Sequence, residues 1–391
     1  MRWLEWFGYK PSLAAFARLM IAQLGRDGSP WRFDAEAGSL VNDEGQTINP
    51  GNMHMAYLAA PLRERGELLR RWCGFAIGSR QEIPDLWVVA QRKLRTVVRG
   101  VHDLALSEID ARGATMDLVR APIAADFERR LACDFEHHMA LVPGAKLATW
   151  GVDADTALAI GTRNVAGLSA VEWSDNDGVF LLSAPEGYTE SYLLVDRVVA
   201  QLPFAAHAVL ASPNRGWLLA VDGRSAAAVD MLAGMVRRLM ESEPWPQSAA
   251  LLQRGENGEW RALDAPASVR NLERWWRACR YSDQKAALEK RLAREHRDVY
   301  VASCGTMEKD GELSTWTSWA EGVVALLPRT EIVGFAPGDG EMLFVAWDDV
   351  VAVAGGRLQA QAESPPRFLV ESFPDATEWQ ALALRAVHPA S

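Results

Sequence analysis

The spacing of apolar residues over the first 115 positions is that of amphipathic helices. Apolar side chains recur every three or four residues, and Ser12 precedes the first such stretch at the position of a helix N-cap. A short hairpin, 31–42, separates the first predicted helix from the others. The predicted helices cover residues 12–24, 53–60, 64–77 and 86–109. Residues 1–115 are therefore expected to form a mainly helical N-terminal region.

The last of these predicted helices is basic. It contains Arg92, Lys93, Arg95 and Arg99 between its valines and leucines. Charged residues grouped on an amphipathic helix usually form its solvated face. We therefore expect these four side chains to point to solvent.

From residue 116 to 267 the pattern changes to short apolar runs that are separated by turn residues. Asp175–Gly178, Pro213–Gly216 and Glu256–Gly258 each stand between two such runs, and a helical stretch follows each pair. Runs joined by so short a turn pair in antiparallel fashion. The pattern predicts an α+β domain in which repeated strand–turn–strand–helix units build an antiparallel sheet.

Residues 283–391 repeat this pattern after a charged helical stretch, 284–295. The turn sequence at 308–311 is expected to join a strand at 299–303 to one at 313–317, and a second hairpin surrounds residues 337–340. The whole chain is therefore expected to be of the α+β class. Its predicted parts are the helical region 1–115, the α+β domain 116–267 and a second α+β unit 283–391.

Composition narrows the class of protein. Of the 391 residues, 49% are hydrophobic and 24% are charged, which is typical of globular rather than disordered chains. The formal net charge is −10, whereas binding to nucleic acid depends on cations that neutralise phosphates. We therefore expect no nucleic-acid partner.

The cysteines and the N-terminus indicate a compartment. The four cysteines form no Cys-x-x-Cys pair and are too few for a disulfide framework, which favours reduced thiols. Glu5, Lys10 and Arg18 interrupt the N-terminal apolar run, so that neither a signal peptide nor a membrane span is expected. The predicted location is the cytoplasm, without membrane binding.

Short motifs occur in order along residues 1–265. The strongest runs from Leu202 to Val221 and is centred on Pro213-Asn214-Arg215. The others lie at Lys10–Phe16, Asn49–Pro61, Trp150–Leu158 and Pro244–Trp260. In this order they resemble the YtpQ-like family of bacterial proteins of unknown function. The resemblance implies a bacterial cytoplasmic α+β protein, and it supplies no activity and no cofactor.

Asn214 and Arg215 occupy the turn at the centre of the strongest motif. An arginine there could hold a carboxylate or a phosphate through two hydrogen bonds. Pro-Asn-Arg-Gly is also ordinary turn chemistry, in which asparagine tolerates a positive φ. Both interpretations stay open, and we take the two residues as candidate binding residues.

Tryptophan is unusually frequent, with sixteen residues against six tyrosines. The pairs Trp275-Trp276 and Trp316/Trp319 lie near the junction of the two α+β units. Adjacent residues of a helix cannot both face one core, and tryptophan is enriched at binding hot spots. We expect these four side chains to join the two units, with one or two left exposed for a partner protein.

No pattern identifies a metal, a cofactor or a catalytic residue. Cys133 and His137 are four apart in a stretch that reads as helical, but no third ligand accompanies them. Cys304 follows a predicted strand without a nearby base. Asp348 and Asp349 begin a short helix, where carboxylates complement the helix dipole.

These observations favour a non-enzymatic protein that binds another protein. An immunity or regulatory protein that blocks a basic partner would fit the acidic charge. The alternative is a hydrolase with a site at the junction of the two α+β units, built from Arg215, Cys304 and Asp348.

Overall fold

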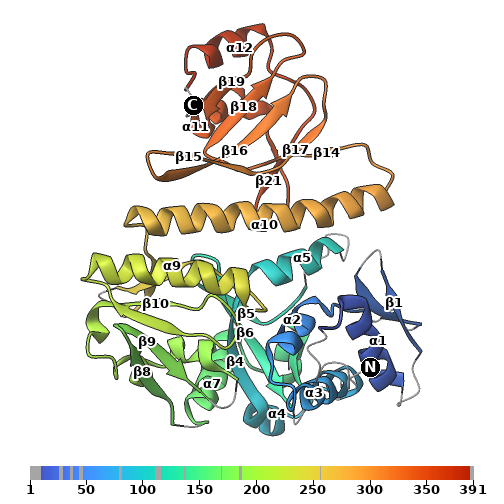
Figure 1. Ribbon diagram of the computed structural model, residues 1–391, viewed down its shortest axis with the longest axis vertical. Helices are drawn as coiled ribbons and strands as arrows, with labels where there is room; N and C mark the ends of the chain where they lie inside the picture. Colours follow the sequence, from blue (N-terminus) through green and yellow to red (C-terminus); the bar gives the residue numbers. More distant parts are fainter. Residues whose placement is uncertain are drawn as a thin grey trace.

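The predicted α+β class is confirmed by a computed structural model, in which antiparallel sheets follow an N-terminal helical part. Figure 1 shows a larger lower part and a smaller upper part, with the long helix α10 (Ala267–Arg294) running between them. The structure describes residues 10–25, 30–35, 38–43, 47–78, 82–110, 116–135, 138–168, 170–184, 187–255 and 257–387.

The first three predicted N-terminal helices and the hairpin are confirmed. Helix α1 (Leu13–Leu24) begins at Ser12, whose hydroxyl accepts a hydrogen bond of 3.3 Å from the Ala15 amide. Its apolar face packs with two further helices and a small antiparallel sheet around the fully buried Phe16. These elements are α2 (Gly51–Ala59), α3 (Arg65–Gly78), β1 (Trp31–Asp34), β2 (Ser39–Asn42) and β3 (Thr47–Ile48).

The prediction of one helix over 86–109 is wrong. A short helix, α4 (Trp87–Lys93), leads into strand β4 (Leu94–Gly100) and then helix α5 (His102–Asp110). Strand β4 pairs along its whole length with β6 (Phe127–Asp134). Its centre, Thr96-Val97-Val98, is β-branched and suits a strand, and pairing with a distant partner outweighs the helical spacing. Consequently Arg99 is buried and not solvated.

Strand β6 lies at the centre of the sheet that β4 joins. The other members of this sheet are β5 (Arg120–Ala124) and β7 (Met139–Leu141). Cys133 therefore lies in a strand and not in the helix that the sequence predicted, while His137 lies outside the described residues. Helices α6 (Ala145–Trp150) and α7 (Ala154–Ala166) follow this sheet.

The three predicted hairpins of residues 116–267 form one antiparallel sheet. Its strand order is β13-β12-β10-β11-β9-β8. One face packs against α9 (Ala226–Ser242) and the first half of α10, and the other face packs toward β4. The helix predicted over 189–200 is instead a 3-10 helix, η3 (Thr189–Leu194), followed by α8 (Asp196–Val199). The strands are β8 (Glu172–Asn176), β9 (Val179–Ser183), β10 (Ala208–Ala211), β11 (Leu219–Asp222), β12 (Leu251–Arg254) and β13 (Trp260–Ala262).

Helix α10 replaces two predicted helices, 267–280 and 284–295. It runs for 28 residues without a break. Leu272 and Trp276 in its first half pack with α9 and the six-stranded sheet. Leu288 and Leu292 in its second half pack with residues of the C-terminal unit. One continuous helix thus contacts both parts of the molecule (Figure 1).

The C-terminal unit contains two four-stranded sheets. The first has the order β14-β17-β21-β20 and the second the order β15-β16-β18-β19. Helices α11 (Trp347–Ala354) and α12 (Ala376–Ala383) pack on the second sheet around Trp319 and Phe335. The strands are β14 (Tyr300–Val301), β15 (Gly305–Lys309), β16 (Glu312–Ala320), β17 (Ala325–Pro328), β18 (Ile332–Ala336), β19 (Leu343–Ala346), β20 (Gln359–Ala360) and β21 (Arg367–Val370).

The turn predicted at 308–311 is correct, but one of the strands assigned to it is wrong. Strand β15 pairs with β16 across this turn. Residues 300–301 pair instead with β17, in parallel. Strands β16 and β18 are also parallel, which the turn chemistry of neighbouring segments does not reveal. In the described ranges of the chain, no helix is both long and apolar enough to cross a membrane.

Candidate functional site

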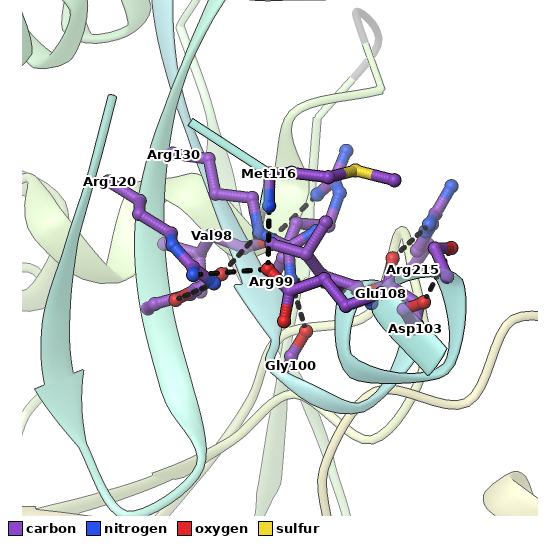
Figure 2. A network of polar contacts seen from close by, with 12 residues as sticks. Val98, Arg99, Gly100, Asp103, Glu108, Met116, Arg120, Arg130 and Arg215 are labelled. Atoms are coloured by element: carbon purple, nitrogen blue, oxygen red, sulfur yellow. Dashed lines mark hydrogen bonds and ion pairs between the residues drawn. The ribbon is translucent and has the colours of Figure 1, made fainter. Parts of the chain in front are cut away.

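Arg215 belongs to a network of charges that runs from the surface into the protein (Figure 2). Its Nη2 donates to Asp103 Oδ2 at 2.9 Å, and Asp103 Oδ1 accepts from Arg130 Nη2, also at 2.9 Å. Arg130 Nε in turn donates to Glu128 Oε1 at 2.5 Å. Arg130 and Glu128 are buried. Through these pairs the Asn214–Arg215 turn is tied to α5 and β6.

A second buried pair fixes the same turn. Arg99 of β4 forms an ion pair with Glu190 of η3, and Glu190 is only 1% exposed. The other oxygen of Glu190 accepts a hydrogen bond of 3.0 Å from the Gly216 amide. Gly216 has φ +84°, a conformation that favours glycine at this turn position. Glu190 therefore bridges a buried arginine and the backbone of the turn.

The pKa shifts show that the network stabilises charged carboxylates. Burial alone would raise the pKa of Asp103, but the ion pairs with Arg130 and Arg215 outweigh it and lower that pKa. The pKa of Arg215 is also lowered, because burial and the neighbouring Arg99 outweigh the attraction of Asp103 and Glu190. A carboxylate held ionised in this way is a poor proton donor or acceptor near neutral pH.

The space beside this network is small. Its volume is 50 Å³, and its lining includes Asn52, Gly100, Asp103 and Arg215. One or two water molecules would fill such a volume. Asn214 is fully buried, and its side-chain amide donates to the Glu243 and Pro244 carbonyls at 2.9 and 3.2 Å. The contacts of both residues join parts of the fold.

Trp275 and Trp276 attach helix α10 to the lower part of the molecule. Trp276 is 5% exposed, and its indole Nε1 donates to Asp126 Oδ2 at 3.0 Å. Trp275 is half-buried beneath the Arg237 guanidinium, 5.1 Å from the ring centroid. These contacts lie within the lower part of the molecule, and Trp275 keeps intermediate exposure.

Trp316 and Trp319 point to opposite faces of one strand. They are three residues apart in β16, and side chains alternate along a strand. Trp319 is fully buried and stacks on Phe335 at a centroid distance of 5.3 Å. Trp316 is only half-buried and lies on the opposite face, where its ring meets Phe344 edge-on at 6.2 Å. The sequence prediction treated both tryptophans alike and did not distinguish the buried Trp319 from the half-buried Trp316.

The face of the sheet that carries Trp316 has a floor of small residues. The Trp316 ring lies against Gly305, where a Cβ would come within 2.5 Å of its Nε1. Phe344 and Met342 lie in the same way against Gly334. The register places Ser318 beside Gly334 and Trp316 beside Ile332 on this face. We call the following seven residues the open face: Gly305, Trp316, Ser318, Ile332, Gly334, Met342 and Phe344.

The open face extends over all four strands of the sheet and is partly accessible. Trp316, Ser318, Ile332 and Phe344 all keep intermediate exposure, and Met342 is 43% exposed. The helices α11 and α12 pack with Trp319, Phe335 and Val345, which are on the other face. An apolar surface of this kind typically marks a contact with another molecule.

Acidic residues border the open face at both ends. Glu308 and Asp310 lie at the turn between β15 and β16, and Asp339 and Glu341 lie at the turn between β18 and β19. All four are exposed. Because β16 and β18 run in parallel, the turn before one and the turn after the other lie at opposite ends of the sheet.

The candidates for catalysis are not assembled into a site. Arg215 pairs with Asp103 in the lower part, while the Asp348 side chain is 95% exposed and lies 4.0 Å from Arg329. Burial raises the pKa of the Cys304 thiol to about 11, against the attraction of Arg277 and Arg367. Burial likewise raises the pKa of Cys133 to about 11. Within the described part of the chain, no three His, Cys, Asp or Glu side chains gather as metal ligands would.

Cys304 is expected to react slowly with iodoacetamide. With a pKa of about 11, roughly one thiol in a thousand is ionised at pH 8, about 100-fold fewer than for an ordinary cysteine. The labelling rate should rise about tenfold per pH unit, as followed by mass spectrometry. A Leu384→Cys thiol provides the exposed reference, since Leu384 is 89% exposed. Rapid labelling of Cys304 at pH 7 would indicate an activated nucleophile and contradict this assignment.

Most of the open face was not predicted from the sequence. Trp316 was a candidate binding residue, but Gly305, Gly334, Met342 and Phe344 were not. The alternation Thr315-Trp316-Thr317 carried a signal, because a strand period of two already separates Trp316 from Trp319. Nothing in the sequence marked Gly305 or Gly334. They leave room for the Trp316, Phe344 and Met342 side chains only because β15, β16, β18 and β19 pair in one sheet.

Comparisons with known proteins add no further assignment. The resemblance of residues 1–265 to the YtpQ-like family stays a prediction that rests on the short motifs alone. The chain matches no protein-family model, no curated protein and no solved structure.

Proposed function

We propose that this protein is a non-enzymatic binding protein that holds a partner protein on the open face of its C-terminal unit. The observation that carries the proposal is the half-buried Trp316, whose ring lies against Gly305 and beside Phe344 on the sheet face that α11 and α12 do not cover. A rigid aromatic side chain in a preformed apolar surface is the kind of residue that dominates binding energies.

The charges around this face define the partner. Glu308, Asp310, Asp339 and Glu341 border it, and the chain as a whole carries a net charge of −10. A partner surface with an apolar centre and a basic rim would be complementary, and electrostatic attraction would speed their association. An immunity or regulatory protein that covers the working surface of a basic protein in the bacterial cytoplasm would have these properties.

The alternative, a hydrolase at the junction of the two α+β units, has less support. Its three residues Arg215, Cys304 and Asp348 take part in separate sets of contacts. A nucleophile needs a base within hydrogen-bonding distance and a depressed pKa, whereas the pKa of Cys304 is raised.

Co-purification from the cells that encode the protein tests the proposal. The wild type is expected to recover a basic protein in stoichiometric amount, and Trp316→Ala is expected to lower the recovery at least about tenfold, because a tryptophan anchor is worth 2 kcal/mol or more. Tyr300→Ala is the matched control, since Tyr300 is 50% exposed on the same unit but outside the open face.

Two outcomes would contradict the proposal. One is the recovery of no stoichiometric partner by the wild type. The other is an equal loss of the partner in Trp316→Ala and Tyr300→Ala, which would show that the open face has no special part in binding.

A further inference from the structure

Strand β15 is an edge of the sheet that carries the open face. It has one neighbour in this sheet, β16, and pairs with it without a bulge over residues 305–309. The opposite edge, β19, is covered by the chain itself, because Ala386 pairs with Val345 and the Val387 amide donates to the Phe344 carbonyl at 2.8 Å. The edge strands of the other sheet of this unit, β14 and β20, have two residues each, whereas β15 has five.

The tight turn after β15 determines which of its backbone groups point away from β16. Asp310 and Gly311 have φ +52° and +79°, as in a two-residue type I′ hairpin turn. The residues next to such a turn form a hydrogen-bonded pair, and bonded pairs alternate along an antiparallel ladder. The backbone N–H and C=O groups of Thr306 and Glu308 therefore point to the edge. Both residues are exposed, and no backbone group in the described part of the chain pairs with them there.

Backbone groups at the edge of a sheet are complementary to the backbone of another extended segment. Natural proteins commonly protect such an edge with a proline, a bulge or a very short strand. Strand β15 has none of these features. Its one basic residue, Lys309, stands next to the turn, and its backbone bonds to β16 rather than to the edge. The edge is therefore able to accept a further strand.

The open face continues onto this edge. Gly305 belongs to it, and Met307, two residues further along the strand, points to the same side. The Trp316 ring extends from β16 over β15, since a Cβ on Gly305 would come within 2.5 Å of its Nε1. A segment that pairs with β15 would thus place every second side chain beside this indole.

The charge on the other side of β15 is negative. Side chains alternate along a strand, so that Glu308 points away from the side that carries Met307. Asp310 follows at the turn, and both carboxylates are exposed. A segment in which apolar residues alternate with basic ones would match the open face on one side and these carboxylates on the other.

We propose that the partner protein adds an extended segment of this alternating pattern to β15, as a further strand of the sheet. The proposal rests on the proposed function, because it assigns how the partner occupies the open face. Backbone hydrogen bonds at Thr306 and Glu308 hold the segment in place, and its apolar side chains contact Trp316 and Met307.

A proline at position 306 tests the backbone bond itself. Proline has no N–H, and at a position that points outward it leaves the bonds between β15 and β16 in place. Co-purification from the native cells should recover the partner at least about tenfold less with Thr306→Pro than with the wild type, because a bond is lost and the ring obstructs the added strand. Thr306→Ala is the matched control: it loses the same hydroxyl but keeps the N–H, and should recover the partner within about twofold of the wild type. Circular dichroism and the unfolding midpoint confirm that both variants are folded.

Hydrogen exchange followed by NMR tests the same bonds without a substitution. In the free protein the amides of Thr306 and Glu308 should exchange rapidly, whereas those of Met307 and Lys309, which bond to β16, should be protected. In the complex with the co-purified partner, the Thr306 and Glu308 amides should exchange at least about tenfold more slowly.

Several results would overturn the proposal. Protection of the Thr306 and Glu308 amides in the free protein would show that the edge is already covered. A partner that is lost with Trp316→Ala but kept with Thr306→Pro would show that the open face binds without an added strand, so that the proposed function survives and strand addition fails. Dimerisation of the wild type that Thr306→Pro abolishes would assign the edge to a second copy of the chain. Recovery of no partner by the wild type contradicts the proposed function and strand addition together.

Discussion

Replacing Glu190 by alanine is expected to lower the free energy of unfolding by about 3–5 kcal/mol. The change leaves Arg99, which is 8% exposed, without its counter-ion. It also removes the acceptor of the Gly216 amide. A buried charge that loses its partner costs far more than an exposed pair, because water cannot replace the lost interaction. Urea unfolding followed by tryptophan fluorescence and by circular dichroism measures the change.

Two further variants make this result specific to the buried pair. Glu172→Ala changes an exposed glutamate of the same part of the protein and should cost no more than about 0.5 kcal/mol. The double variant Arg99→Met/Glu190→Met removes both charges and should recover much of the loss seen with Glu190→Ala. A loss below about 1 kcal/mol for Glu190→Ala would show that the network does not stabilise the fold.

Replacing Arg367 by methionine is expected to destabilise the C-terminal unit by about 3–4 kcal/mol. Arg367 is fully buried, and burial lowers the pKa of its guanidinium to about 10. It donates to Gln284 Oε1 at 2.6 Å, to the Ala302 and Leu326 carbonyls at 2.8 and 2.9 Å, and to the Tyr281 carbonyl at 3.2 Å. Methionine has a similar shape but would leave these buried acceptors unpaired.

The effect of Arg367→Met should be local. Hydrogen exchange should quicken in β17, β21 and the second half of α10, because Arg367 joins them, and should change little in α9. Arg367→Lys should be nearly as harmful, since an ammonium lacks the planar fork that reaches four acceptors. Arg329→Met is the exposed control, with a side chain 60% exposed. An unchanged unfolding midpoint for Arg367→Met would contradict the assignment.

Local chemistry explains which parts of the fold the sequence predicted. The hairpin turns at 175–178, 213–216 and 337–340 contain Asp, Asn and Gly residues that suit the tight connection whatever the rest of the chain does. Helix α1 was likewise predicted from its N-cap Ser12 and its apolar spacing. Such features depend on residues close in sequence.

Features that depend on distant partners were not predicted. Strand β4 was taken for a helix, because its valines and leucines also satisfy a helical spacing and its partner β6 is about 30 residues away. The charged network was hidden for the same reason: Arg99, Asp103 and Glu190 belong to three elements that only the fold brings together. A set of basic residues next to one another in sequence gave no sign that one of them is buried.

The surroundings of the candidate binding residues also depend on distant partners and were not predicted. The sequence singled out Trp316 and Trp319 together, but strand alternation gives them opposite surroundings. Phe344 reaches Trp316, and Met342 reaches Gly334, only because β18 connects β16 to β19 within one sheet. Their contribution therefore depends on a sheet order that includes a parallel pair, which no local turn specifies.

Photo-crosslinking in the native cells tests the binding role of the open face most directly. A photoreactive residue at Ser318 lies on this face beside Gly334, and one at Val351, which is 48% exposed on α11, serves as the control. The proposal predicts a crosslink from position 318 to one basic protein, its loss when Trp316→Ala is added, and no such product from position 351. Equal crosslinking from both positions, or none from position 318, would contradict it.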